Sequence, residues 1–346
     1  MNPILAQTWQ PDEIPDVDVP TVASDDWLAH FSAGTVSAAD LHRIELPHHA
    51  PLLDRWFAEG DLGFIFAARG VGKTHLGLAM ARALAEGGSV GPWRAHAAVP
   101  VLYVDGEMNA EQIRERDAAL AKCDGALEYL NHELLFARTE RTLNLARREC
   151  QDGLTALCLA RGVRVLLLDN LSTLFSGVAE NDNDAWEAVL PWLLHLRRLN
   201  IAVVIIHHAG RNGQMRGASR REDPAAWVLR LEDAIDVATV KRGAKFVSTF
   251  TKPSRHTSTE VPSYAWEFVP DKDTGRCEVK FRDASGLEVF LQWIGEGLKT
   301  AGQIASEMNV SPGTVSKLAK RAKAEGRIDI RGRKYFLTYG KESLEN

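Results

Sequence analysis

The sequence predicts an α/β protein with a mainly parallel sheet, helices on both faces of that sheet, and a small C-terminal domain. Three observations lead to this fold class. Apolar strand-like runs alternate with helical patterns, as in β-α-β units. A loop with two glycines joins the first of these strands to the first helix. Near the C-terminus, three helical patterns precede two short strands.

Length and composition fit one large α/β domain with appended segments. The chain has 346 residues, of which 45% are hydrophobic. No apolar run approaches the roughly 18 residues that span a bilayer, and the N-terminus lacks a basic region followed by an apolar one. We therefore expect a cytoplasmic protein. The cysteines have no C-x-x-C spacing, which argues against a zinc ribbon or a disulfide framework and suggests reduced packing residues: Cys123, Cys150, Cys158 and Cys277.

The charge distribution is uneven along the chain. The net charge is −5, but residues 300–340 contain eight basic and three acidic residues, a net +5. The rest of the chain therefore carries −10, and the first fifty residues are rich in Asp and Glu. A basic segment on an acidic body suggests a polyanionic partner. Within the acidic lead, Trp27, Leu28 and Phe31 have helical spacing. Other tryptophans are expected to pack in the core or at an interface: Trp56, Trp93, Trp186, Trp192 and Trp227.

The glycine-bearing loop has the pattern of a nucleotide-binding P-loop. It follows the apolar run 62–66 and opens a helical pattern over 75–86. In such a loop backbone N–H groups face phosphates, Lys73 reaches the β- and γ-phosphates, and the Thr74 hydroxyl holds Mg²⁺. The first position is Ala67, where glycine is usual. We predict ATP and Mg²⁺ as cofactors, with these nucleotide-binding residues: Ala68, Arg69, Gly70, Val71, Gly72, Lys73, Thr74 and His75.

The order of elements after the loop predicts the parallel sheet. Strands are expected at 99–104, 134–137, 163–168 and 201–206, with helices at 111–121 and 150–161. Asp169 ends one strand, where a carboxylate can organise Mg²⁺; alternatively it caps the following turn. The next residue is Asn170 rather than an acid, so another strand must supply the residue that activates water. Glu107, at the end of 99–104, is the candidate base, unless it is an ordinary exposed turn acid.

Further strand ends carry polar candidates. His207 and His208 end the strand 201–206, where one imidazole can sense the γ-phosphate; a zinc site would need more ligands. A strand over 246–251 leads to Lys252 and Arg255, which can act on the nucleotide of a neighbouring subunit.

The loop over 209–221 is glycine-rich and basic. It suits backbone contacts to single-stranded DNA in a central channel, through Arg211, Arg216, Arg220 and Arg221. Two alternatives stay open. It can be an ordinary solvated surface loop, or one of its arginines can reach a neighbouring subunit's nucleotide.

Taken together, the P-loop, the run 101–108 (VLYVDGEM), residues 166–170, the double histidine and residues 216–219 (RGAS) resemble the RepA-like branch of RecA-fold ATPases, which includes plasmid replicative helicases. The resemblance spans about residues 48–270. It implies a ring-forming, usually hexameric, ATP-dependent motor on DNA. It also implies that Lys73 and Thr74 bind phosphate and Mg²⁺, Asp169 organises Mg²⁺, Glu107 is the catalytic base, and His208 or its neighbour is the sensor.

The chain departs from that family at the arginine finger. The plasmid helicases place a finger shortly after the glycine-rich loop, where this chain has Ala225, Ala226 and Trp227. Lys252 and Arg255 resemble the K-x-R element of DnaB-type helicases with one extra residue between them. Arg255 is therefore the first candidate for the finger.

The C-terminal pattern is that of a winged helix-turn-helix. Helices are predicted at 287–294, 300–308 and 312–324, with Ser311 as N-cap and Pro312 in the first turn of the third. A hairpin over 327–337 forms the wing. The residues expected to contact duplex DNA are Lys317, Lys320, Arg321, Arg331 and Arg333. The alternative is a winged helix that mediates protein contacts.

These predictions combine into three domains: an acidic segment with a short helix at 1–47, a RecA-like ATPase core at 48–284, and a winged helix at 285–340. The primary functional hypothesis is an ATP-dependent DNA helicase that serves replication of a plasmid, phage or mobile element. One alternative is a nucleotide-switched DNA-binding regulator or loader without unwinding activity. The other is a RecA-like recombination ATPase.

Overall fold

A computed structural model describes residues 26–45, 49–120, 123–175, 183–209, 223–233, 243–257, 261–271, 274–308 and 310–338. The chain divides into two compact units, Met1–His48 and His49–Asn346. In the first unit, α1 (Trp27–Gly34) is capped by the Asp26 side chain and α2 (Ala38–Leu41) by the Ser37 side chain. The apolar side chains of α1 are exposed, with Leu28 at 76%.

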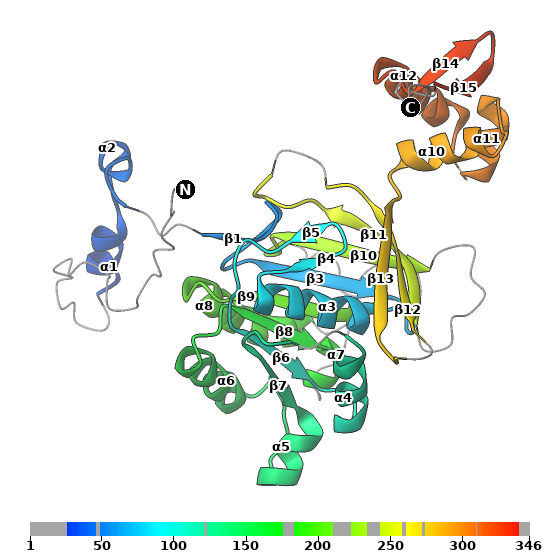
Figure 1. Ribbon diagram of the computed structural model, residues 1–346. Helices are drawn as coiled ribbons and strands as arrows, with labels where there is room; N and C mark the ends of the chain where they lie inside the picture. The colour runs from blue at the N-terminus through cyan, green and yellow to red at the C-terminus, as the bar shows by residue number, and fades with distance from the viewer. Residues whose placement is uncertain are drawn as a thin grey trace, which may run out of the picture. The chain divides into compact units, whose positions relative to one another are not determined.

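A nine-stranded sheet forms the centre of the second unit (Figure 1). Its order is β13-β12-β11-β10-β3-β9-β8-β6-β7. The run from β10 to β7 is parallel, and β11, β12 and β13 continue the sheet as antiparallel neighbours. The prediction of an α/β fold with a mainly parallel sheet is confirmed. The parallel strands are β3 (Leu62–Ala67), β6 (Val101–Asp105), β7 (Leu127–Asn131), β8 (Val165–Asp169), β9 (Ala202–His208) and β10 (Trp227–Asp233).

The remaining strands are short or antiparallel. The antiparallel part of the large sheet consists of β11 (Ala244–Lys252), β12 (Tyr264–Pro270) and β13 (Cys277–Asp283). Two small hairpins stand apart from it, β1 (Pro51–Leu53) with β2 (Phe57–Ala58), and β4 (Ser89–Val90) with β5 (Trp93–Arg94).

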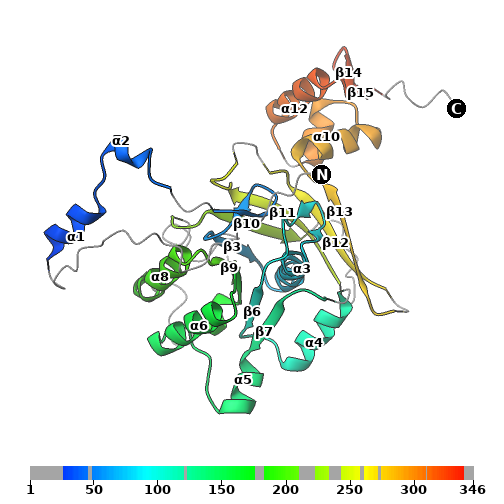
Figure 2. The same ribbon diagram turned by 60° about the vertical axis from the view of Figure 1, so that its left-hand side comes forward.

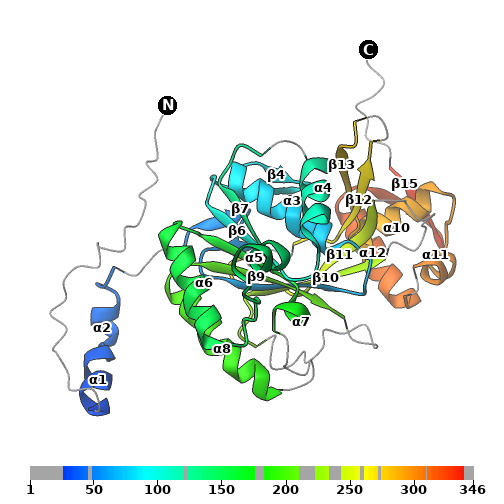
Figure 3. The ribbon, with the colours of Figure 1, turned by 90° about the horizontal axis from the view of Figure 1, so that it is seen from below.

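Helices cover both faces of the sheet (Figure 3). One face packs against α3 (Lys73–Glu86), and α4 (Ala110–Ala119) lies on the same side. The other face packs against α6 (Arg148–Ala160), α7 (Leu171–Leu174) and α8 (Asn183–Arg198). Side chains alternate between the two cores, because successive strand residues point to opposite faces. Along β6, for example, Tyr103 belongs to the α3 side and Val104 to the α6 side.

One predicted strand is wrong. Residues 134–137 lie in a helix, α5 (His132–Thr139), and the strand in this region is the preceding β7. The Asn131 side chain accepts hydrogen bonds from the backbone N–H groups of Glu133 and Leu134 and so starts the helix there. The run Leu134–Phe136 is apolar but partly exposed. A short apolar run does not distinguish strand from helix by its periodicity.

Aromatic residues dominate the core beside the antiparallel strands. Trp56 packs edge-on against Trp93 and Trp227, with ring centroids 5.0 Å apart in both pairs. These three tryptophans are buried, as are Trp186 and Trp192 of α8, which confirms their predicted packing role. All four cysteines are free thiols, and Cys158 is buried.

Three helices and a hairpin follow β13 and share a core of their own (Figure 2). They are α10 (Gly286–Gly295), α11 (Ala301–Glu307), α12 (Pro312–Ala324), β14 (Ile328–Arg331) and β15 (Lys334–Leu337). The Ser311 hydroxyl caps α12, as predicted. Arg327, before the hairpin, forms a two-pronged ion pair with Glu288 of α10. In the part of the chain that the structure describes, no helix has the length and apolar character needed to cross a membrane.

Candidate active site

The P-loop connects β3 to α3 and needs its glycines for conformational reasons. Gly70 and Gly72 have φ values of +81° and +124°, which L side chains rarely adopt. A Cβ at Gly72 would also lie 2.8 Å from the Cβ of Ala244. The strand β11 therefore packs directly against the loop and leaves no room for a side chain there.

Lys73 begins α3, and its side chain turns back into the loop. Its Nζ donates to the carbonyl oxygens of Ala67 (3.2 Å) and Ala68 (2.8 Å). Burial lowers the pKa of Lys73, while the charges of Asp169 and Glu107 act to raise it. A buried ammonium beside the first N–H groups of a long helix forms a positive site for phosphate.

The other predicted nucleotide-binding residues lie around this loop. Arg69 is exposed, Val71 is buried, and the His75 ring lies 5.8 Å from the ring of Phe268. Burial, with a smaller contribution from Arg116, lowers the pKa of His75 to about 4.

Thr74 and Asp169, the predicted magnesium ligands, meet across the sheet edge. The Thr74 hydroxyl donates to Oδ2 of Asp169 at 2.8 Å, and the Tyr103 hydroxyl donates to the same oxygen at 2.7 Å. Burial raises the pKa of Asp169, against the effect of those two hydrogen bonds. A hydroxyl and a carboxylate are oxygen ligands of the kind Mg²⁺ prefers, so these residues fit the ion.

The side chains that the structure describes do not complete a metal site by themselves. Among the described residues, no group of three or more His, Cys, Asp or Glu side chains is placed to hold a metal ion. Mg²⁺ in nucleotide sites commonly takes its remaining ligands from water and phosphate. The pair Thr74 and Asp169 is compatible with that arrangement.

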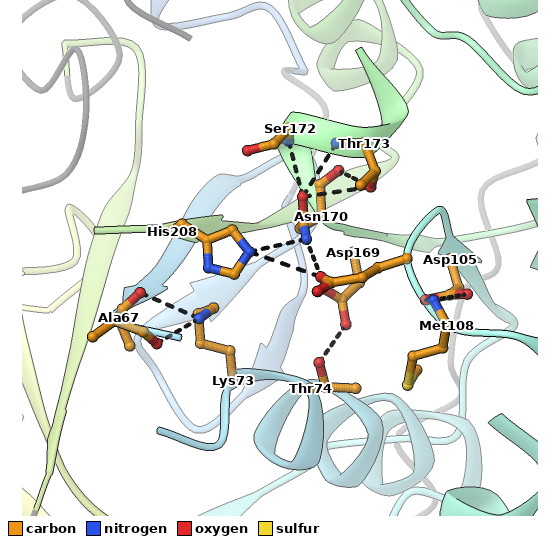
Figure 4. A network of polar contacts seen from close by, with 12 residues as sticks. Ala67, Lys73, Thr74, Asp105, Met108, Asp169, Asn170, Ser172, Thr173 and His208 are labelled. Carbon is orange, nitrogen blue, oxygen red and sulfur yellow. Dashed lines mark hydrogen bonds and ion pairs between the residues drawn. The ribbon is translucent and has the colours of Figure 1, made fainter. Parts of the chain in front are cut away.

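The Asn170 side chain contacts both Glu107 and His208, and Figure 4 shows it beside His208. The Nδ2 of Asn170 donates to Oε2 of Glu107 and contacts Nε2 of His208 at 3.2 Å. The Glu107 oxygen and the His208 nitrogen are 3.8 Å apart. The predicted base and the predicted sensor therefore share one amide group, and sequence reasoning gave Asn170 no role.

The two adjacent histidines lie in different surroundings. His207 is fully buried and pairs in register with Phe66, on the face that packs against α8. His208 pairs with Ala67 at the P-loop, on the face of α3. Burial and the charge of Lys73 lower the pKa of His208, which favours the neutral imidazole. The structure thus brings His208, and not His207, to Glu107.

A second polar cluster holds the turn that carries Glu107. The buried carboxylate of Asp105 accepts hydrogen bonds from the Met108 N–H (3.1 Å) and from Asn131 Nδ2 (2.7 Å). The same Asn131 amide donates to the Met108 carbonyl at 2.8 Å, and the Gly106 N–H donates to the Asp169 carbonyl at 2.8 Å. Burial, and then the charge of Asp169, raise the pKa of Asp105 to about 6. The sequence assigns no role to Tyr103, Asp105 or Asn131, although the first two lie in the run 101–108; the parallel register of β6, β7 and β8 brings them together.

Lys252 and Arg255 lie at the opposite edge of the sheet. Lys252 pairs with Val228, and Val228 pairs with Phe64 near the start of β3, whereas the P-loop follows the end of β3. Both cations donate to the carbonyl oxygen of Asp223, at 3.2 Å and 2.9 Å. They do not join the cluster around Lys73 of their own chain.

The predicted DNA contacts lie in two regions. The side chains on α12 and the hairpin are exposed: Lys317, Lys320, Arg321, Arg331 and Arg333. Two of them are ion-paired, Arg321 with Glu325 and Arg331 with Asp329. The loop candidates lie outside the described residues: Arg211, Arg216, Arg220 and Arg221.

Residues 29–214 match the AAA_25 family, described as an AAA domain, and this is more than half of the chain. The chain belongs to the AAA domain family. The matched range includes Lys73, Glu107, Asp169 and His208, and it ends before Lys252. No curated protein matches the sequence.

The solved structures that match the chain include two proteins at low sequence identity. A KaiC-like protein from Pyrococcus horikoshii is 15% identical, with a TM-score of 0.47, over 64% of this chain and 90% of that chain. The flagellar accessory protein FlaH from Methanocaldococcus jannaschii is also 15% identical, with a TM-score of 0.44 and the same coverage.

Proposed function

We propose that this AAA-domain protein hydrolyses ATP to move along or unwind DNA, as a motor of the RepA-like helicase type. One observation carries the ATPase part: Lys73, Thr74, Asp169, Glu107 and His208 converge at the edge where β3, β6, β8 and β9 end. Each of these residues has a distinct chemical role in phosphoryl transfer.

In this reaction the residues bind phosphate, hold Mg²⁺ or accept a proton. The P-loop N–H groups and Lys73 bind the β- and γ-phosphates. When the nucleotide binds, the Lys73 ammonium gives up its hydrogen bonds to the carbonyl oxygens of Ala67 and Ala68. Thr74 and Asp169 hold Mg²⁺, which neutralises negative charge on the phosphate oxygens when it is bound. Glu107 orients the attacking water and accepts its proton.

His208 supplies the γ-phosphate contact. Its Nδ1 is buried and has no hydrogen-bond partner among the described residues, although Lys73 is near enough to affect its charge. A buried donor without a partner beside a phosphate-binding lysine suits a contact to the terminal phosphate, which is lost after hydrolysis.

The C-terminal helices and hairpin support DNA as the partner. Their order, helix-helix-helix-hairpin, is that of a winged helix-turn-helix. The exposed cations on α12 and on the hairpin suit duplex phosphates, so we assign DNA binding to residues 285–340. The assembly that this function calls for is a homo-oligomer, in the RepA-like case a hexamer.

The test is ATP hydrolysis and strand separation of a forked duplex, with and without single-stranded DNA. Glu107→Gln is expected to lower kcat by about 10²- to 10⁴-fold, because the amide does not accept the proton. Glu111→Gln is the matched control, since Glu111 is exposed on α4 and its ion pair within the described part of the chain is with Arg114. Hydrolysis without unwinding would indicate the regulator or loader instead, and strand exchange would indicate a recombinase. Hydrolysis that survives Glu107→Gln would contradict the assignment of the base.

A further inference from the structure

The orientation of the Asn170 side chain is fixed by its own helix. Asn170 is the N-cap of α7, and its Oδ1 accepts hydrogen bonds from the N–H groups of Ser172 (3.0 Å) and Thr173 (3.2 Å). Only an oxygen can accept from two N–H donors, so the amide nitrogen must point the other way. The identity of the two amide atoms is therefore determined by the backbone.

That nitrogen faces the two predicted functional side chains. It carries two hydrogens, and its two partners are Oε2 of Glu107 and Nε2 of His208. We propose that Asn170 is a positioning residue that holds Glu107 and His208 in a fixed relation through the two N–H bonds of one amide. This inference rests on the proposed ATPase function and adds a residue to it.

The geometry also sets the tautomer of His208. The Asn170 Nδ2 is a donor only, so the Nε2 of a neutral His208 must accept. The ring proton then sits on Nδ1, the buried atom without a partner among the described residues. Asn170 thus leaves Nδ1 as the N–H donor of His208, the group that a γ-phosphate oxygen would accept from in the proposed function.

A coupling between hydrolysis and the sensor follows. When His208 gains or loses a phosphate contact and its ring shifts, the shared amide must shift or lose one of its bonds. The Glu107 carboxylate is held by the same nitrogen, so it responds to that shift. Helix capping alone does not require asparagine, because Ser, Thr or Asp also caps. Asparagine combines the capping oxygen with two donors.

Asn170→Asp separates these two roles. The carboxylate keeps an oxygen for the α7 cap, but it loses both donors and places a negative charge beside Glu107. We expect kcat to fall by about 10- to 100-fold through misplacement of Glu107. The KM for ATP should change little, whereas the buried charge should lower the thermal unfolding midpoint. Asn109→Asp is the matched control: Asn109 caps α4 in the same way, is exposed, and has no contact with Glu107.

A double variant tests whether Asn170 acts through Glu107. In Glu107→Gln combined with Asn170→Asp, kcat should be no lower than in Glu107→Gln alone. If the two losses multiply instead, Asn170 acts independently and the inference is overturned. A wild-type kcat in Asn170→Asp, with Glu107→Gln inactive, overturns it too. Absence of ATP hydrolysis in the wild type would instead refute the proposed function.

The tautomer provides a readout that needs no nucleotide and no activity. Imidazole ¹⁵N shifts of histidine-labelled protein, with His208 assigned from the signal missing in His208→Gln, should show the Nδ1–H tautomer. In Asn170→Asp the carboxylate accepts rather than donates, so Nε2 should carry a proton. An Nε2–H tautomer in the wild type, or no change in Asn170→Asp, would overturn the inference even if the protein is an active ATPase.

Discussion

Two buried carboxylates end neighbouring strands beside the P-loop. Asp105 of β6 and Asp169 of β8 are partners in register, and they are 0% and 2% exposed. Each has hydrogen-bond donors, but burial disfavours both charged forms, and the charge of Asp169 adds to this effect at Asp105 as that of Glu107 does at Asp169. At the residue scale, the site therefore concentrates negative charge where a cation and Lys73 are expected to offset it.

This charge predicts a pH dependence of stability for Asp105→Asn. The folded-state pKa of Asp105, about 6, lies above the ordinary value of 3.8, so between these pH values the folded protein binds more protons than the unfolded chain. Asp105 then lowers the unfolding free energy as pH rises through that window. Asp105→Asn lacks this titrating group. The unfolding free energy of the variant minus that of the wild type should therefore rise with pH, by at most about 1.4 kcal/mol per pH unit. Urea unfolding from pH 4 to 7 measures the difference; parallel curves would contradict it.

The two loop glycines predict unequal costs of substitution. Gly72→Ala places a Cβ against Ala244 and Phe246, in addition to its unfavourable φ, whereas nothing lies within 4 Å of a Cβ at Gly70. We expect Gly72→Ala to lower the unfolding free energy by about 2–4 kcal/mol and Gly70→Ala by about 1–2 kcal/mol. Denaturant unfolding without nucleotide measures both values. Equal losses of unfolding free energy would show that Ala244 and Phe246 move aside without a cost in free energy.

At the element scale, helix α12 has one buried apolar face and one exposed basic face. Val315, Ala319 and Ala322 of α12 are buried against α10, α11 and the hairpin, while Lys317 and Lys320 are exposed. This amphipathic arrangement leaves the cations on the side away from the core.

Lys317→Ala and Lys320→Ala test the DNA contact of that face. Each variant should weaken duplex binding and reduce the slope of log affinity against log salt concentration by about 0.9, the release of one phosphate's counterions. Fluorescence anisotropy with labelled duplex at several salt concentrations measures both. Lys245→Ala, on β11 and paired with Glu267, is the control that should leave the slope unchanged. Unchanged affinity in the α12 variants would favour a protein-binding winged helix.

At the scale of the whole molecule, the sheet separates two sets of candidate groups. The P-loop cluster lies at one edge, and Lys252 and Arg255 lie at the other. A single chain therefore does not bring Arg255 to its own Lys73. An arginine finger at this position requires a second copy of the chain.

Mixing two inactive variants tests that requirement. Glu107→Gln subunits retain Arg255, and Arg255→Ala subunits retain Glu107, so an equimolar mixed oligomer should regain hydrolysis at about a quarter of its interfaces. ATP turnover as a function of mixing ratio measures this. A mixture of Glu107→Gln with Lys73→Ala should stay inactive, because both changes affect the same side of each interface. No recovery in the first mixture would remove Arg255 as the finger.

Much of the fold follows from local signals in the chain. The P-loop, the strands at 62–67, 101–105, 165–169 and 202–208, and the helices at the C-terminus have clear periodicity or caps. The segment 127–139 is where the secondary-structure prediction is wrong. The apolar side chains at 134–136 lie partly exposed on a helix that Asn131 starts, and not in a strand. The amino-acid composition of a short segment does not determine which other element that segment packs against.

The sequence by itself determined the chemistry of the site: a phosphate-binding loop, a strand-end acid, a second acid on another strand and a pair of histidines. Only the tertiary structure decided how they combine. It separated His207 from His208, because strand alternation turns adjacent side chains to opposite faces. It placed Asn170 between Glu107 and His208, and Asn131 beside Asp105, because parallel register aligns strand ends that are distant in sequence.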